Sequence, residues 1–294
     1  MAYLMDYHDT CEGCSGKTYA RQGFDVGGYW TENGREQRPP ISEGIGGEIE
    51  CGTNEDNGYC GTSDFVDNYL EPEIRKVFDE GFFKYQRDAS IDFDYPVEII
   101  SQVFKRGWYN NGGREKLIYL FNNIFTKLGI EQNDSCGNHI NISKALFIND
   151  RSAWLFDEEI TNNYEKYLYI FGRTDYEGQR VDNTYYEQRK QDGREDGHYT
   201  AVNWAHWDEG SASRLELRIV GKAQSGEQYC GYIDTIFALI DKCNAQAKAE
   251  KKSAKKKYRW QTILYYDADG NISRRRTVYT NGYIGTYYEE EKND

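Results

Sequence analysis

The stretch GIGGEIEC, Gly44 to Cys51, places two acidic residues, Glu48 and Glu50, one residue apart in a strand-like segment. Alternate residues of a β-strand point to the same face, so the two carboxylates project side by side. Like charges at that distance raise the free energy of the folded chain unless a cation or a strong donor lies between them. The segment alone is typical either of a solvated strand face or of a strand that lines a cation site.

The composition indicates an acidic protein with much extended structure. Of 294 residues, 49 are Asp or Glu and 36 are Lys or Arg, which gives a formal net charge of -13. This balance disfavours a general coat for nucleic acid and suits a protein that holds metal ions. The 26 tyrosines and 29 glycines favour strands and tight turns over a helical bundle.

The sequence carries no pattern that directs it to a membrane. Its first residues lack a basic region followed by an apolar run, and no window is apolar enough for a membrane span. We therefore expect a cytoplasmic protein with no membrane partner. The odd number of cysteines, seven, predicts reduced thiols. His8, Cys11 and Cys14 have spacings that a structural zinc ion could use, with free thiols in a polar arm as the alternative.

Composition divides the chain into three parts. Residues 1–42 form an N-terminal arm that contains cysteines, residues 43–248 a central domain of strands and helices, and residues 249–294 a basic linker with a C-terminal β-hairpin or meander. Strands and helices mix without regular βαβ alternation, which favours an α+β fold with a mainly antiparallel sheet. Periodicity predicts helices over 69–83, 114–130, 161–173 and 227–252, strands over 44–51, 90–101, 136–143, 198–204 and 213–221, and a tail hairpin that turns at Asp269-Gly270.

Four of the predicted strands carry polar residues with a period of two. These residues are Glu48 and Glu50, then Glu98, then His139 and Asn141, and last Glu216 and Arg218. A sheet that joins these strands would line one surface with carboxylates, an imidazole and a guanidinium. Such a surface can bind ATP with Mg²⁺ in a chain that lacks a Walker loop, since oxygen ligands hold the metal and a guanidinium clamps a phosphoryl group.

The order of these motifs resembles that of the glutamine synthetase and glutamate–cysteine ligase superfamily of carboxylate–amine ligases, most closely its amidoligase branch. GIGGEIEC is similar to the family's G-x-E-x-E strand, and RDASIDFDYPVEIIS to its D-G-S segment and E-[LIV]-[LIV]-S strand, with Ala89 in place of glycine. CGNHINIS resembles C-G-x-H-[IV]-H-[IV], with Asn141 in place of the second histidine. HYTAVNW followed by RLELRIV resembles a late pair of strands, one that ends in Asn and one with E-[FL]-R. The likeness covers residues 43 to 245.

The resemblance implies a fold, an activity and roles for individual residues. The fold would be a curved antiparallel sheet of the glutamine-synthetase-like type with helices on one face. The activity would be ATP-dependent amide formation through an acyl phosphate, with two or more Mg²⁺ ions. The implied metal ligands are Glu48, Glu50, His139 and Glu216; the implied catalytic residues are Arg218, Glu98 and Asn141; the implied nucleotide-binding residues are Arg218 and Asn203.

The carboxylate and the amine could each belong to a small molecule, a peptide or a protein, and two other functions stay open. The first is a metal-dependent nucleic-acid enzyme or replication protein that uses the same acidic and histidine-bearing sheet. The basic stretch KAEKKSAKKKYRW and the later SRRR would then bind nucleic acid, although a solvated helix end is the plainer interpretation. The second is an inactive descendant of the ligase fold that serves as a binding or structural protein.

Overall fold

The computed structural model describes residues 43–54, 58–88, 90–173, 200–209 and 213–257, and strands in 259–266, 272–280 and 287–290, with side chains as far as residue 251. The predicted zinc ligands His8, Cys11 and Cys14 and the substituted Ala89 lie outside the described residues. So do the side chains of the basic tail from residue 252 on. The chain divides into two compact units, Met1–Ile240 and Asp241–Asp294.

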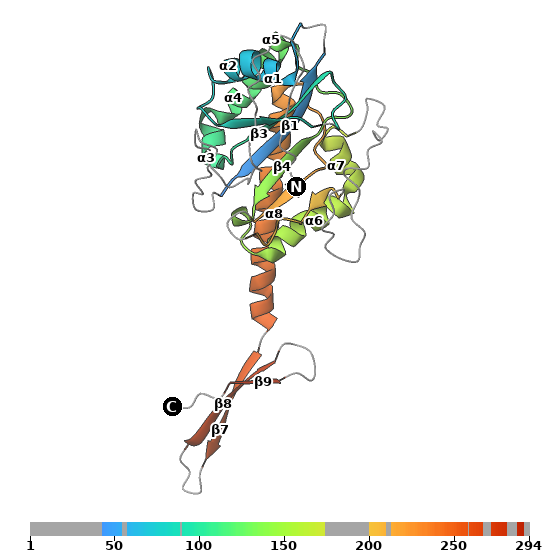
Figure 1. Ribbon diagram of the computed structural model, residues 1–294. Coiled ribbons are helices and arrows are strands. Elements are labelled where there is room, and N and C mark those ends of the chain that lie inside the picture. The colour runs from blue at the N-terminus through green and yellow to red at the C-terminus, as the bar shows by residue number, and fades with distance from the viewer. Residues whose placement is uncertain are drawn as a thin grey trace. The chain divides into compact units, whose positions relative to one another are not determined.

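A six-stranded antiparallel sheet forms the centre of the first unit (Figure 1), which confirms an α+β fold. The strands are β1 (Ile45–Thr53), β2 (Phe83–Gln86), β3 (Tyr95–Ser101), β4 (Asn138–Ser143), β5 (Val202–Asn203) and β6 (Arg214–Leu217). Their order across the sheet is β2-β3-β1-β4-β6-β5, and every neighbouring pair is antiparallel. The strand that contains Glu48 and Glu50 is therefore central.

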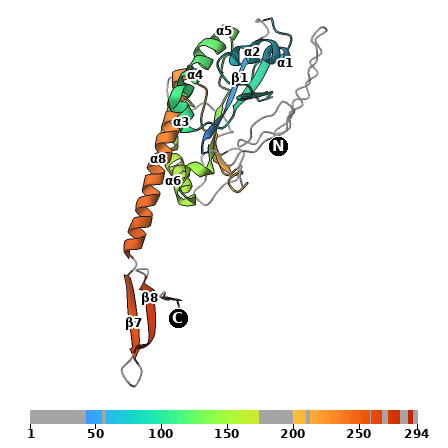
Figure 2. The ribbon, with the colours of Figure 1, turned by 90° about the vertical axis from the view of Figure 1, so that its left-hand side faces the viewer.

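One face of the sheet is apolar and packs against helices. Its strands contribute fully buried aliphatic side chains, namely Ile45, Ile49, Ile99, Ile140, Ile142, Leu215 and Leu217. The first turns of α8 (Gly226–Lys257) contact this face, because a Cβ atom on Gly47 would lie 2.2 Å from the hydroxyl oxygen of Tyr229. Figure 2 shows α8 and α4 (Arg114–Tyr119) on the same side of β1. Burial of this face supplies most of the hydrophobic stabilisation of the sheet.

Two groups of helices meet α8. The first group follows β3 and comprises α3 (Arg106–Trp108), η3 (Tyr109–Gly113), α4, η4 (Leu120–Phe125) and α5 (Thr126–Leu128). In it, Tyr109 donates a hydrogen bond to the carbonyl oxygen of Cys230 at 3.1 Å. The second group is α6 (Asp150–Asn162) and α7 (Tyr164–Ile170), after which Phe171 contacts Tyr232 edge to face. A short helix, η5 (Lys144–Leu146), follows β4.

Several element boundaries differ from those expected from periodicity. The helix predicted over 69–83 instead runs through α1 (Thr62–Phe65), η2 (Val66–Leu70) and α2 (Glu71–Ile74), and Phe83 begins a strand. Gly81, with φ of 74°, ends the turn that separates α2 from β2. The strand predicted from residue 90 begins at Tyr95, because side-chain hydrogen bonds from Asp88 and Ser135 take up the backbone N–H groups of Ser90 and Asp92.

The second unit contains a meander of three antiparallel strands, β7 (Arg259–Tyr266), β8 (Ile272–Thr280) and β9 (Tyr287–Glu290). This confirms the predicted β tail, while the turn expected at Asp269-Gly270 lies outside the described residues. Among the helices described, none is both long and apolar enough to span a membrane. The five cysteines in the described part of the chain are all free thiols, as expected from their odd number.

We predict that Gly47→Ala lowers the free energy of unfolding by about 1–3 kcal/mol, because its Cβ atom would overlap the buried Tyr229 hydroxyl. Removal of that hydroxyl in Gly47→Ala/Tyr229→Phe should recover much of the loss. Gly231→Ala in α8 is the matched control, since a Cβ atom there meets nothing within 4 Å. Urea denaturation measures all four proteins, and an equal loss in the single and double variants would contradict the predicted overlap.

Candidate metal centre and active site

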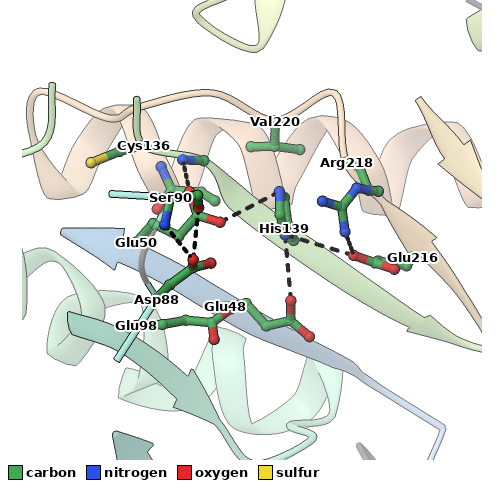
Figure 3. A network of polar contacts seen from close by, with 12 residues as sticks. Glu48, Glu50, Asp88, Ser90, Glu98, Cys136, His139, Glu216, Arg218 and Val220 are labelled. Atoms are coloured by element: carbon green, nitrogen blue, oxygen red, sulfur yellow. Dashed lines mark hydrogen bonds and ion pairs between the residues drawn. The ribbon is translucent and has the colours of Figure 1, made fainter. Parts of the chain in front are cut away.

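Strand register brings the polar residues of four strands into one band across the second face of the sheet. Glu50 on β1 lies directly opposite Glu98 on β3, and Glu48 lies directly opposite His139 on β4. Asn141, also on β4, lies opposite Glu216 on β6. Directly paired residues of antiparallel strands point to the same face, so all of these side chains converge. Figure 3 shows His139 at the centre of the group.

The imidazole of His139 lies between carboxylates on both of its nitrogen-bearing edges. Its Nδ1 atom is 3.4 Å from Oε2 of Glu48 and 3.6 Å from Oε1 of Glu216, and its Nε2 atom is 3.8 Å from Oε1 of Glu50. These separations exceed those of hydrogen bonds. Glu48, Glu98 and His139 each offer a ligand atom within 4.8 Å of the others, an arrangement that could hold a metal ion.

Each of the four carboxylates has one oxygen atom held by a donor from the protein. The donors are the Asn141 amide to Glu48, the Gly137 backbone N–H to Glu50, the Gln86 amide to Glu98, and the Asn203 amide to Glu216. The second oxygens of Glu48, Glu50 and Glu216 are those that lie nearest His139. A carboxylate held at one oxygen in this way presents the other in a fixed direction.

The pKa values reflect the burial of this charge. Burial raises the pKa of Glu50 to about 7, although the Gly137 N–H group lowers it in part. Burial also raises the pKa of Glu98 well above its usual range, with the charge of Glu48 adding to the effect. Burial, together with the charge of the nearby Arg218, lowers the pKa of His139 to about 3. His139 is therefore neutral at pH 7, as a metal ligand must be.

Arg218 and Asn203 both contact Glu216. Arg218 donates through Nη1 to Oε1 of Glu216, and Asn203 donates through Nδ2 to Oε2 at 2.9 Å. The Oδ1 atom of Asn203 accepts from the backbone N–H of Ala205 at 2.9 Å. The structure thus places Asn203 as a residue that orients Glu216; its predicted contact with nucleotide stays a prediction. Glu216, paired with a guanidinium, lies within the predicted metal group but carries a charge that is already balanced.

Asn141 presents its amide in one defined direction. Its Nδ2 atom donates to Oε1 of Glu48 at 2.7 Å, and its Oδ1 atom accepts from Nε of Arg214 at 3.0 Å. The carbonyl oxygen therefore faces a guanidinium, so Asn141 acts here as a donor to Glu48. Sequence reasoning missed Arg214, although it alternates with Glu216 and Arg218 in RLELR and so shares their face.

Sequence reasoning also missed Gln86 and Arg173. Gln86 lies directly opposite Glu98 on the edge strand β2. The buried guanidinium of Arg173 donates to the carbonyl oxygens of Cys136, Arg218 and Val220, and so joins the start of β4 to the end of β6. Nothing in the sequence around either residue indicates these contacts, because Gln86 depends on the pairing of β2 with β3 and Arg173 on the approach of the chain after α7 to β4 and β6. Arg173 thus holds the backbone just before His139, at Cys136, and the backbone of the neighbouring segment, at Arg218 and Val220.

The arrangement has the chemistry of a cation site beside an anion site. Buried carboxylate oxygens with one neutral imidazole suit a hard divalent cation, and Arg218 supplies a positive charge on the same face. Comparison with models of protein families and a search of curated proteins each found no match to this chain. The functional assignment therefore depends on the geometry of the site and on the sequence motifs.

We predict that the metal-free protein, in excess chelator, loses stability as pH rises from about 4.5 to about 7 because of Glu50. The folded state keeps a proton on Glu50 to about pH 7 while the unfolded chain releases it near 4.5, so folding binds protons in this window. His139 opposes this trend between its unfolded pKa of 6.5 and its folded value of about 3. Glu98, whose pKa is also raised, adds to the loss of stability with rising pH.

The variant Glu50→Gln isolates the contribution of Glu50. Its free energy of unfolding, relative to that of the wild type, should rise by on the order of 2 kcal/mol between pH 4.5 and pH 7.5. Glu131→Gln, which alters an exposed carboxylate, should leave the wild-type profile unchanged. Parallel profiles for Glu50→Gln and the wild type would show that Glu50 does not titrate with a raised pKa.

Proposed function

We propose that this protein is an ATP- and Mg²⁺-dependent carboxylate–amine ligase of the amidoligase type, with a sheet of the glutamine-synthetase-like kind. The observation that carries the proposal is the convergence of Glu48, Glu50, Glu98 and Glu216 on neutral His139, with Arg218 on the same face. The four motifs of the sequence that resemble this family contribute those same side chains. Motif order and spatial convergence are separate observations, and both favour the ligase.

The residues fit a divalent metal ion. Ligands bound at about 2.1 Å to one ion lie roughly 3–4 Å from each other, which matches the separations of 3.4 and 3.6 Å around Nδ1 of His139. Glu48, Glu98 and His139 would hold one ion. Glu50 lies outside this group, on the Nε2 side of the ring at 3.8 Å, where it could contribute to a further ion. Oxygen donors outnumber nitrogen donors, which favours Mg²⁺ or Mn²⁺ over zinc.

The proposed reaction forms an amide in two steps. An oxygen of the substrate carboxylate bonds to the γ-phosphorus of ATP as the bond to ADP breaks. The amine nitrogen then bonds to the acyl carbon, phosphate departs with the electron pair of the acyl–oxygen bond, and the nitrogen loses a proton. Bound Mg²⁺ supplies charge neutralisation for the triphosphate.

Arg218 would contribute to both steps by donating hydrogen bonds to the oxygens of the transferring phosphoryl group. Glu216 accepts a hydrogen bond from the Arg218 guanidinium and another from the Asn203 amide, so Asn203 and Glu216 together fix the position of that guanidinium. Glu98 would remain in the metal group, where the Gln86 amide holds one of its oxygens. The protein thus contributes mainly position and charge, which is what phosphoryl transfer requires.

The carboxylate and the amine are those of small molecules, peptides or protein side chains. The nucleic-acid alternative concerns a basic stretch in which, of the basic residues, only the exposed Lys248 and Lys251 have described side chains, so it stays a prediction. Binding of ATP distinguishes the inactive descendant from the ligase, because only the ligase is expected to be stabilised by ATP.

We predict that Mg²⁺ and ATP together raise the melting temperature of the full chain by about 5 °C when ATP is present at roughly 100 times its Kd. Glu48→Ala should abolish the shift, because it removes a ligand that faces His139. Arg218→Ala should abolish the response to ATP while Mn²⁺ alone still stabilises the protein. Differential scanning calorimetry with each ligand alone and with both gives the comparison.

Glu131→Ala, at an exposed carboxylate outside the site, is the control and should melt and respond as the wild type does. A wild-type transition that responds to Mn²⁺ but not to ATP would overturn the ligase and support the inactive descendant. A transition that responds to neither would overturn the metal centre as well.

A further inference from the structure

We infer that Arg214 is a positioning residue for the metal centre, because it fixes the amide of Asn141 and thereby the metal-facing oxygen of Glu48. The inference rests on the proposed function, since it concerns the affinity of the same site for a divalent cation. Arg214 does not reach the centre itself. It acts through two consecutive hydrogen bonds, at 3.0 Å from its Nε to Oδ1 of Asn141 and at 2.7 Å from Nδ2 of Asn141 to Oε1 of Glu48.

The guanidinium and the carboxylate together determine the orientation of the amide between them. A guanidinium only donates hydrogen bonds and an ionised carboxylate only accepts them. Rotation of the Asn141 amide by 180° would place its NH₂ group against Arg214 and its carbonyl oxygen against Glu48, and both contacts would be repulsive. Asn141 is 2% exposed, so water cannot replace the lost bonds readily. One orientation is therefore strongly preferred.

Arg214 is itself held in place from three directions. Its Nη1 atom is 3.3 Å from Oε2 of Glu209, and its backbone N–H donates to the carbonyl oxygen of His206 at 3.0 Å. As the first residue of β6, it also lies opposite Ser143 of β4. The loop between β5 and β6 and the end of β4 thus set the position of its guanidinium. The Nε–H group of Arg214 is therefore a donor in a fixed position for Oδ1 of Asn141.

The consequence for the metal centre follows from the two oxygens of Glu48. Oε1 accepts from Asn141, whereas Oε2 lies 3.4 Å from Nδ1 of His139. Glu48 is the least buried of the three residues grouped as metal ligands, with a side chain that is 19% exposed. A partly exposed glutamate can adopt several rotamers, and the hydrogen bond from Asn141 favours the one that turns Oε2 toward His139. Loss of a partner that orients a ligand typically weakens metal binding by about 10- to 100-fold.

The test is Mn²⁺ binding to the full chain, measured by isothermal titration calorimetry. Arg214→Met, which keeps the length of the side chain but removes the donors, should raise the Kd for Mn²⁺ about tenfold. Arg214→Lys keeps the charge and a single donor, and should give an intermediate Kd. Arg75→Met, at an exposed arginine paired with Glu71 and Glu80 in another part of the fold, should bind as the wild type does.

A double-mutant cycle separates positioning through Asn141 from a general effect of charge or packing. Asn141→Ala should weaken Mn²⁺ binding to a similar degree, and Arg214→Met should have little further effect in that background. A purely electrostatic or structural contribution of Arg214 would persist without Asn141. If the increase in Kd for Mn²⁺ in the double variant equals the product of the increases in the two single variants, the inference is wrong. Melting temperatures of all variants without metal report whether each one folds; if Arg214→Met does not, Arg214→Lys completes the cycle.

The outcomes distinguish the inference from the function on which it rests. If the wild type binds Mn²⁺ and Arg214→Met binds it equally well, the inference is wrong and the metal centre stands. If the wild type binds no Mn²⁺, the metal centre is wrong and the inference falls with it.

Discussion

Mutual repulsion among Glu48, Glu50, Glu98 and Glu216 would disfavour this fold unless other groups balanced it. Each carboxylate receives one hydrogen bond from a defined donor, and Glu216 also pairs with Arg218. These contacts balance part of the charge. Burial still raises the pKa of both Glu50 and Glu98, and at Glu98 the charges of Glu48 and Glu50 add to the effect. A divalent cation would complete the balance, because it binds the ionised forms of carboxylates that otherwise retain their protons.

One face of the sheet carries the apolar packing that stabilises the fold, and the other carries the polar side chains of the candidate site. On one face, Ile49, Ile140 and Leu217 are fully buried, and α8 approaches so closely that position 47 accommodates only glycine. This packing holds the strands in one register, and a slip by a single residue would turn every polar side chain of a strand toward the helices. The precision of the site therefore derives from hydrophobic contacts on the opposite side of the same strands.

The sequence predicted those features that depend on neighbours along the chain. The alternation of Glu48 with Glu50, and of Glu216 with Arg218, is a local pattern, so the shared face could be recognised without knowledge of strand order. Gln86 and Arg173 escaped recognition because their partners come from segments distant in the sequence. Arg214 shares the local alternation of Glu216 and Arg218, but its contact with Asn141 depends on the pairing of β4 with β6. The start of β3 was displaced where the side chains of Asp88 and Ser135 accept hydrogen bonds from backbone N–H groups, which the periodicity of hydrophobic residues does not record.

Asn141 illustrates how one substitution can preserve an architecture while it changes the chemistry. In the family that the sequence resembles, the equivalent position holds a second histidine, which can ligate a metal or move a proton. Asn141 does neither, since its carbonyl oxygen faces Arg214 and its amide nitrogen faces Glu48. In this structure the Asn141 amide supports Glu48, a residue of the proposed metal centre, so under the proposed ligase function a proton released by the amine would go to another acceptor.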